Sequence, residues 1–162
     1  MEKPTVYLET SVISYLSSRM SRDLVVAGHQ QVTRAWWELH RDEFEIFVSP
    51  VVLEEISAGD PEESARRLEI IRTNAGIIRN SSEAEELAAL FIKIGMLPPK
   101  AANDAAHVAV AAVKGIDYLL TWNCKHIANA RVNRVILKVC QDLGYSAPLL
   151  CTPLELIGGN YD

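Results

Sequence analysis

Short apolar segments alternate with longer segments of helical periodicity along almost the whole chain, and this alternation constrains the fold more than any other feature. Strands are predicted where β-branched, aromatic and aliphatic residues run together, at 5–8, 45–48, 76–79, 117–121 and 149–152. Helices are predicted between them, from about 12, over 23–41, after 50, over 61–74, over 83–94, over 102–114 and over about 127–143. Strands that are separated by helices pair in parallel, and the helices cover both faces of the sheet. We therefore expect an α/β, Rossmann-like fold of three layers with a central parallel sheet of four or five strands.

Capping residues indicate where several of these helices begin. Ser49 stands directly before Pro50, a pair that is typical of a helix start. Thr10 or Ser11 offers a hydroxyl to cap the helix that follows the first strand. Gly115 ends the alanine-rich helix over 102–114.

Length and composition favour one folded domain. A chain of 162 residues has room for a single substantial core, and 49% hydrophobic residues exclude a disordered chain, so we expect 1–162 to form one domain. No apolar stretch reaches the roughly 20 residues that cross a bilayer. The opening residues, MEKPTVYLE, also lack the apolar core of a signal peptide. We therefore expect a cytoplasmic protein with no membrane segment.

Three cysteines, Cys124, Cys140 and Cys151, are too few and too irregularly spaced for a disulfide framework. We expect reduced thiols. A zinc site that combines them with His126 is possible by residue type, but the paired CxxC spacing of such sites is absent.

Charge is distributed unevenly around a net value of -5. Residues 43–63 carry seven acids, whereas residues 118–141 carry none and include Lys125, Arg131, Arg134 and Lys138. Two solvated helix faces of opposite sign explain this pattern. An edge that contacts phosphate groups is the alternative.

Polar side chains fall where predicted strands end. Glu9 follows the first strand, Glu55 lies in the short helix after the second, and Asn123 follows the strand at 117–121. Because the carboxyl ends of parallel strands meet at one edge of a sheet, these side chains are candidates for a common site. Asp104, in the first turn of its helix, shares a helix face with His107. Helix-dipole support for Asp104 and a buried, hydrogen-bonded role for His107 are the ordinary alternatives.

Several carboxylates at one edge repel each other unless a cation lies between them. Oxygen ligands of this kind suit Mg²⁺ or Mn²⁺. Such an ion polarises a phosphodiester and lowers the pKa of an attacking water. The residues alone therefore indicate an acidic metal site.

Four segments, ETS at 9–11, SPVVLEEISAG at 49–59, NDAAHVAVA at 103–111 and TWNCKHI at 121–127, resemble in order and context the PIN-domain nucleases. The resemblance is to the VapC-type toxin ribonucleases of bacterial type II toxin-antitoxin pairs, and it implies a PIN-like fold. It also implies that Mg²⁺ or Mn²⁺ is bound by a catalytic set that corresponds here to Glu9, Glu55, Asp104 and Asn123. Glu55 is preferred to Glu54 because its distance to Gly59 matches the family spacing. Supporting roles are assigned to Thr10, Ser11, Glu54, His107 and Thr121.

Two positions depart from the commonest family pattern. Glu9 stands where aspartate is usual, so its carboxylate reaches one methylene further. Asn123 stands where an acid is usual, which removes one negative charge and weakens binding of a second cation. Three carboxylates still suffice for one ion. The leading interpretation is a metal-dependent endoribonuclease that hydrolyses RNA phosphodiesters as the toxin of a toxin-antitoxin pair. The alternative is a catalytically weakened or inactive PIN-like module that binds RNA or protein.

Candidate substrate and partner contacts follow from the same interpretation. Phosphate contacts are assigned to cations that flank Asp104 and Asn123, namely Lys100, Lys125, His126 and Arg131, although ordinary surface cations explain them equally well. Trp122 is a candidate for base stacking or for the core. The family resemblance implies a small antitoxin protein and a homodimer, with surfaces at 12–16 or at Leu87, Leu90 and Phe91, which core packing explains as well.

Two other folds with a similar alternation are disfavoured. A response-regulator receiver needs a pair of acids after the first strand, where only Glu9 is present. A dinucleotide-binding domain needs a glycine-rich turn there, where this chain has ETSVIS.

Overall fold

The computed structural model describes residues 2–157. Five strands of this part of the chain form one parallel sheet in the order β3-β2-β1-β4-β5. Their bounds are β1 Thr5–Leu8, β2 Glu45–Val48, β3 Gly76–Ile77, β4 Tyr118–Leu120 and β5 Leu149–Cys151. Every pairing is parallel. The sheet confirms the predicted α/β architecture.

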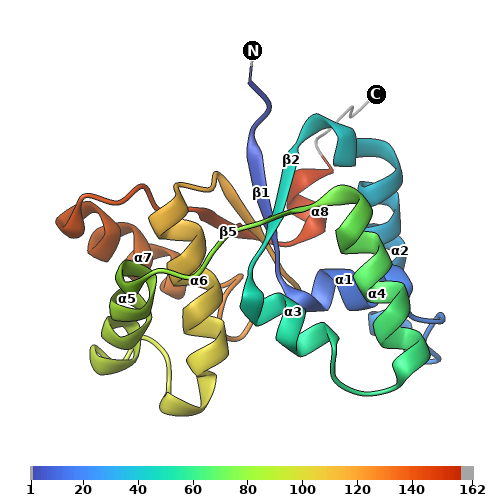
Figure 1. Ribbon diagram of the computed structural model, residues 1–162, viewed down its shortest axis with the longest axis horizontal. Coiled ribbons are helices and arrows are strands. Elements are labelled where there is room, and N and C mark those ends of the chain that lie inside the picture. The colour runs from blue at the N-terminus through green and yellow to red at the C-terminus, as the bar shows by residue number, and fades with distance from the viewer. Residues whose placement is uncertain (1, 158–162) are drawn as a thin grey trace.

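Helices cover both faces of the sheet (Figure 1). One layer holds α1 (Thr10–Ser17), α2 (Leu24–His40), α3 (Pro50–Ile56) and α4 (Pro61–Asn74). The opposite layer holds α5 (Ser82–Lys93), α6 (Ala102–Lys114) and α7 (Ala130–Leu143). A short helix, α8 (Pro153–Leu156), packs on α2. This division is expected of right-handed crossovers that leave β1 toward β2 on one side and reach β4 on the other.

The core lies on both sides of β1. Val6, Tyr7 and Leu8 are all almost fully buried, as is typical of a central strand in a parallel sheet. Trp36 of α2 and Phe91 of α5 complete the two halves of the core, and neither is exposed to solvent. The segments that were candidates for partner binding are mostly part of this core, since Val12, Ile13, Leu87 and Phe91 are buried and Leu90 is half-buried.

The strand order makes the carboxyl end of β1 the expected location of a ligand site. The chain leaves β1 to pair first with β2 and returns on the other side as β4, so β1 and β4 flank a topological switch point, where open α/β sheets bind ligands. Leu8 pairs with Leu120, and the Glu9 backbone N–H donates to the Leu120 carbonyl over 3.0 Å. Glu9 and Thr121 are thereby neighbours.

Two predicted helix starts are wrong. Helix α1 is capped by Glu9, whose carboxylate accepts from the Ser11 N–H, and not by Thr10 or Ser11. Helix α7 begins at Ala130 rather than near 127, with Asn129 as its cap. The intervening chain turns on Asn123, whose carbonyl oxygen accepts from the Ile127 N–H at 3.0 Å. The turn at Asn123 therefore occupies the residues where the helix was expected to begin, and α7 starts three residues later.

Short elements were also outside the sequence prediction. The 3₁₀ turns Arg41–Glu43 and Pro99–Ala101 and helix α8 are too short to show a period. Strand β3 spans only Gly76–Ile77, not 76–79, and β4 ends at Leu120.

The three cysteines are free, Cys124 exposed and the other two buried. Burial, with a smaller contribution from the nearby Glu155 charge, raises the pKa of the Cys151 thiol to about 12. Within residues 2–157, none of the helices combines the length and apolar character needed to cross a bilayer.

Candidate functional site

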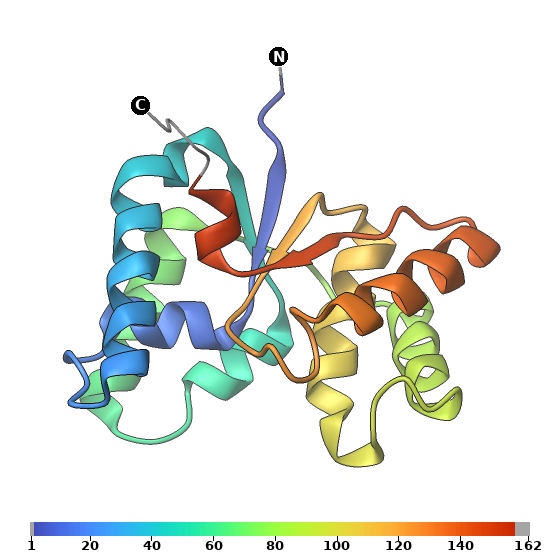
Figure 2. The same cartoon turned by 180° about the vertical axis from the view of Figure 1, so that it is seen from behind.

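Glu9 is a buried carboxylate at the end of β1. Its Oε1 accepts from the Thr121 hydroxyl at 2.6 Å and from the Ser11 hydroxyl, and its Oε2 accepts from the Ser11 N–H at 3.0 Å. Its relative exposure is only 7%. The ends of β1 and β4 and the start of α1 come together at this point (Figure 2). Because all three segments contribute to these contacts, the Glu9 side chain has a fixed direction.

Glu55 of α3 is held by groups from two other elements. Its Oε1 accepts from the Thr10 hydroxyl at 2.7 Å and from His107 Nε2 at 2.6 Å. The side chain of His107 is 1% exposed, whereas that of Glu55 is 30% exposed. Helix α6 therefore delivers a buried histidine to a carboxylate that still reaches solvent.

A chain of hydrogen bonds continues behind His107 into the core. Its Nδ1 lies 2.6 Å from the Tyr7 hydroxyl, which lies 2.7 Å from the Ser49 hydroxyl. An ionised carboxylate can only accept, so the His107 Nε2–H donates to Glu55. Sequence reasoning missed Tyr7 and Ser49. The signals were a tyrosine inside an aliphatic strand and a serine that was expected to be only a helix cap.

The pKa of Glu55 is lowered, although burial alone raises it. Desolvation is the largest influence and favours the neutral form. The hydrogen bond and the charge of His107 act against it, with smaller help from Thr10 and Asn103, and the balance leaves the carboxylate ionised more readily than usual. For Tyr7, burial is the main cause that raises the pKa of the phenol far above its ordinary value.

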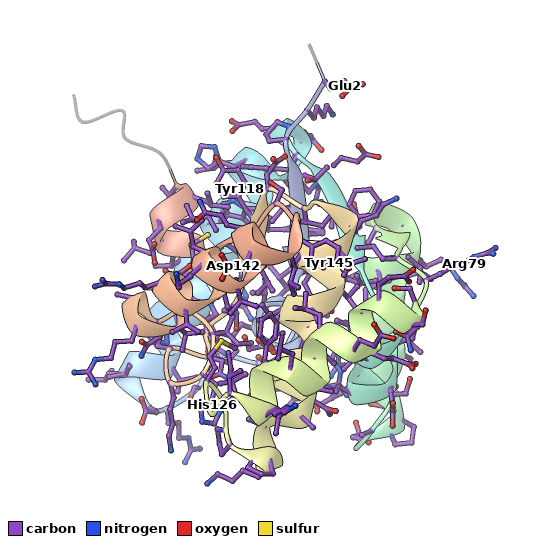
Figure 3. All side chains as sticks on the ribbon, turned by 90° about the vertical axis from the view of Figure 1, so that its left-hand side faces the viewer. Glu2, Arg79, Tyr118, His126, Asp142 and Tyr145 are labelled. Atoms are coloured by element: carbon purple, nitrogen blue, oxygen red, sulfur yellow. The ribbon has the colours of Figure 1, made fainter. Side chains whose placement is uncertain are left out.

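Asp104 of α6 faces a different histidine. Its Oδ2 accepts from His126 Nδ1 at 2.9 Å, and the backbone N–H of His126 donates to Asn123 Oδ1 at 3.0 Å. The side chain of Asp104 is 22% exposed and that of His126 is 19% exposed. His126 lies at the end of the molecule opposite to Tyr118, which begins β4 (Figure 3). Asp104 and His107 therefore point to separate partners despite their shared helix.

The carboxylate oxygens of the site are ligands that suit a hard cation, but they lie too far apart to share one. Glu9, Glu55 and Asp104 each keep hydrogen bonds that orient the carboxylate, as ligating carboxylates do in metal sites. Yet within residues 2–157, no three His, Cys, Asp or Glu side chains are grouped closely enough to hold a metal ion as they stand. The same holds for the zinc alternative. A cation would need these carboxylates to move toward one another.

The remaining candidates have simpler surroundings. Lys100, Lys125 and Arg131 are exposed, and in the described part of the chain none of them forms a salt bridge. His126 is instead bonded to Asp104. Glu54 is exposed on the outer side of α3, while Thr121 is buried and bonded to Glu9. Glu9, Thr10, Ser11, Glu55, His107 and Thr121 thus form one connected region, with Asp104, Asn123 and His126 beside it.

The protein belongs to the α/β class, with a five-stranded parallel sheet whose polar edge lies at the ends of β1 and β4. The search of solved structures returns VapC proteins with this fold. VapBC2 from Rickettsia felis, solved with a DNA fragment from its promoter, has a TM-score of 0.54 and 18% identity, covering 91% of this chain and 96% of that chain. VapC20 of Mycobacterium tuberculosis is a toxin that cleaves the sarcin-ricin loop. It has a TM-score of 0.57 and 17% identity, and the match covers 75% of this chain and 92% of that chain.

These likenesses establish a VapC-like PIN-domain fold. No protein-family model matches the sequence, and no curated protein matches it either.

Proposed function

We propose that the protein is a metal-dependent endoribonuclease that hydrolyses RNA phosphodiesters, and that it acts as the toxin of a toxin-antitoxin pair. The observation that carries the proposal is the placement of three carboxylates, Glu9, Glu55 and Asp104, at the carboxyl edge of a VapC-like fold. Each is oriented by its own hydrogen-bond partners. The RNA cleavage attributed to VapC20 supports the choice of substrate.

The three carboxylates would hold one Mg²⁺ or Mn²⁺, with the Asn123 amide oxygen as a neutral neighbour. A cation of this kind supplies charge for the phosphate and a lowered pKa for the attacking water. His107 and Thr10 keep Glu55 ionised and directed at the site. Ser11 and Thr121 fix the direction of the Glu9 carboxylate through their hydroxyl groups. Lys100, Lys125 and Arg131 are exposed and would contact phosphate groups of the RNA.

The experiment compares cleavage of total RNA and of single-stranded oligoribonucleotides by the purified chain with Mn²⁺, with Mg²⁺ and with EDTA. We expect cleavage only with a divalent ion and a loss of at least about a hundredfold for Asp104→Asn, because a ligand and its charge are removed. Asp142→Asn, an exposed aspartate on α7, is the matched control and should leave the rate unchanged. Cleavage that survives both EDTA and Asp104→Asn contradicts the proposal.

A binding module without catalysis is the second candidate, and one observation favours it. Asn123 Oδ1 already accepts a backbone hydrogen bond from His126, so this side chain has a structural task in the turn. The absence of cleavage together with RNA binding by the same preparation would select this candidate.

The partners are proposed on the same basis. A small antitoxin protein and a second copy of the chain both need apolar surface, and Leu137, Leu143 and Leu149 are each about half exposed. Light scattering of the purified chain tests the homodimer. Co-purification with the product of an adjacent reading frame tests the antitoxin.

A further inference from the structure

Three aromatic rings from distant parts of the sequence meet beside Glu9. Tyr15 comes from α1, His29 from α2 and Trp122 from the chain after β4. His29 and Trp122 are stacked, with ring centroids 4.0 Å apart and planes 11° apart. Tyr15 lies 6.4 Å from each of the other two rings. We call these three residues the aromatic cluster.

The aromatic cluster is not part of the closed core. All three side chains are only partly buried, whereas Trp36, on the same helix as His29, is completely inaccessible to solvent. Stacked rings that remain accessible offer further stacking surface, since each ring added to such a group gains contact area and a favourable geometry.

Trp122 is held in a fixed orientation. Its indole N–H donates to the buried Thr33 hydroxyl over 2.7 Å, and its backbone N–H donates to the Ser11 hydroxyl over 2.9 Å. A ring that is already immobilised loses little freedom when a ligand stacks on it. The cluster is therefore preorganised for a flat ligand.

The same Ser11 hydroxyl connects the cluster to the candidate site. It donates to Glu9 Oε1 and accepts from the Trp122 N–H, so one side chain separates the carboxylate from the tryptophan backbone. On the other side, Asn123 follows Trp122 directly. A base stacked on the cluster would therefore lie next to a phosphate held at the candidate site.

Positive charge accompanies the cluster. The connection between α1 and α2 carries Arg19 and Arg22, both exposed, and one acid, Asp23, whose carboxylate caps α2. Arg34 of α2 donates hydrogen bonds to the Ser18 carbonyl and the Met20 sulfur and so holds this connection against α2. Aromatic rings next to basic groups are the combination that binds single-stranded nucleic acid, where bases stack and the backbone is neutralised.

We propose that the aromatic cluster is a subsite that stacks one nucleobase of the RNA strand next to the cleaved phosphate. This inference rests on the proposed ribonuclease function and adds the substrate subsite to it. It assigns Trp122 to substrate binding as well as to packing.

The test measures binding separately from cleavage. Fluorescence anisotropy of a labelled single-stranded oligoribonucleotide is recorded with the full chain carrying Asp104→Asn, so that the RNA stays intact. Trp122→Leu should weaken binding about 5- to 150-fold, which corresponds to about 1–3 kcal/mol for one stacked base. Trp122→Phe keeps a ring and should retain most of the affinity. Trp37→Leu, eight residues beyond His29 on α2, is the control for loss of a half-buried tryptophan.

A second measurement changes the RNA and not the tryptophan. The chain with Trp122 intact is titrated with oligonucleotides that lack one base at successive positions. One abasic position should weaken binding by the same factor as Trp122→Leu, and the two changes together should not add. Equal affinity for intact and all abasic RNA, no binding of single-stranded RNA at all, or equal effects of Trp122→Leu and Trp37→Leu would overturn the inference.

The two proposals fail in different ways. If the parent chain cleaves RNA while binding is indifferent to the missing base, the nuclease proposal stands and the stacking site is wrong. If binding depends on the base but the parent chain shows no metal-dependent cleavage, the stacking site stands and the nuclease proposal is wrong.

Discussion

Glu55 Oε1 lies 2.6 Å from His107 Nε2, and the histidine is buried while the carboxylate reaches solvent. This pair joins α3 to α6 across the end of the sheet. It connects a candidate ligand at the surface to the hydrogen-bond chain through Tyr7 and Ser49 in the core. The orientation of the site is therefore coupled to the stability of the fold, and this coupling can be measured.

Tyr7→Phe removes the hydroxyl that links His107 to Ser49. Both partners lose a buried hydrogen bond, so we expect the free energy of unfolding to fall by about 1–3 kcal/mol. Urea denaturation measures the change. Tyr118→Phe is the matched control, because its hydroxyl has no hydrogen bond among the described residues, and it should change stability by less than about 0.5 kcal/mol. Equal effects of the two substitutions would show that the hydrogen bonds from Tyr7 to His107 and Ser49 do not stabilise the fold.

Acid should weaken the fold through Glu55. Its pKa is lower in the folded protein than the ordinary value of 4.5, so the unfolded chain takes up a proton first. The stabilising contribution is complete above about pH 5 and is lost as the pH falls through the lowered pKa. Unfolding measured between about pH 3 and 6 in EDTA should show a smaller pH dependence for Glu55→Gln. An identical dependence in the variant would show that His107 does not hold this carboxylate.

Asn123→Asp restores a charge beside the three carboxylates. The aspartate can still accept from the His126 N–H, so the turn should be retained. We expect Mn²⁺ to bind at least about tenfold more tightly, because an opposite charge near the ion adds about 1.4 kcal/mol or more. Calorimetric titration measures the affinity. Asn80→Asp, which adds the same charge at an exposed position, should leave it unchanged.

Much of the fold could be predicted because its signals are local. The parallel sheet follows from short apolar runs between helices, and the placement of Glu9 at its edge follows from a strand that ends at Leu8. Helix starts were less certain from sequence. A carboxylate at Glu9 competes with the adjacent hydroxyls for the same backbone N–H groups, and the geometry of the strand end decides in favour of Glu9.

The side-chain contacts within the site could not be predicted, because the residues that form them come from distant segments of the sequence. His107 and Glu55 are 52 positions apart, and their contact depends on how α6 packs on α3. The stacking of Trp122 on His29 depends in the same way on α2 and on the turn after β4. A single sequence gives the residue types at these positions but not the packing angles that bring them together.

The most direct test is a crystal structure of the chain grown with Mn²⁺ and measured at a wavelength where manganese scatters anomalously. The account predicts one anomalous peak bound by oxygens of Glu9, Glu55 and Asp104 at about 2.0–2.3 Å, with Glu55 and Asp104 drawn together from their positions beside His107 and His126. A structure at millimolar Mn²⁺ with no peak there, and with both carboxylates still only on their histidines, would contradict the central claim.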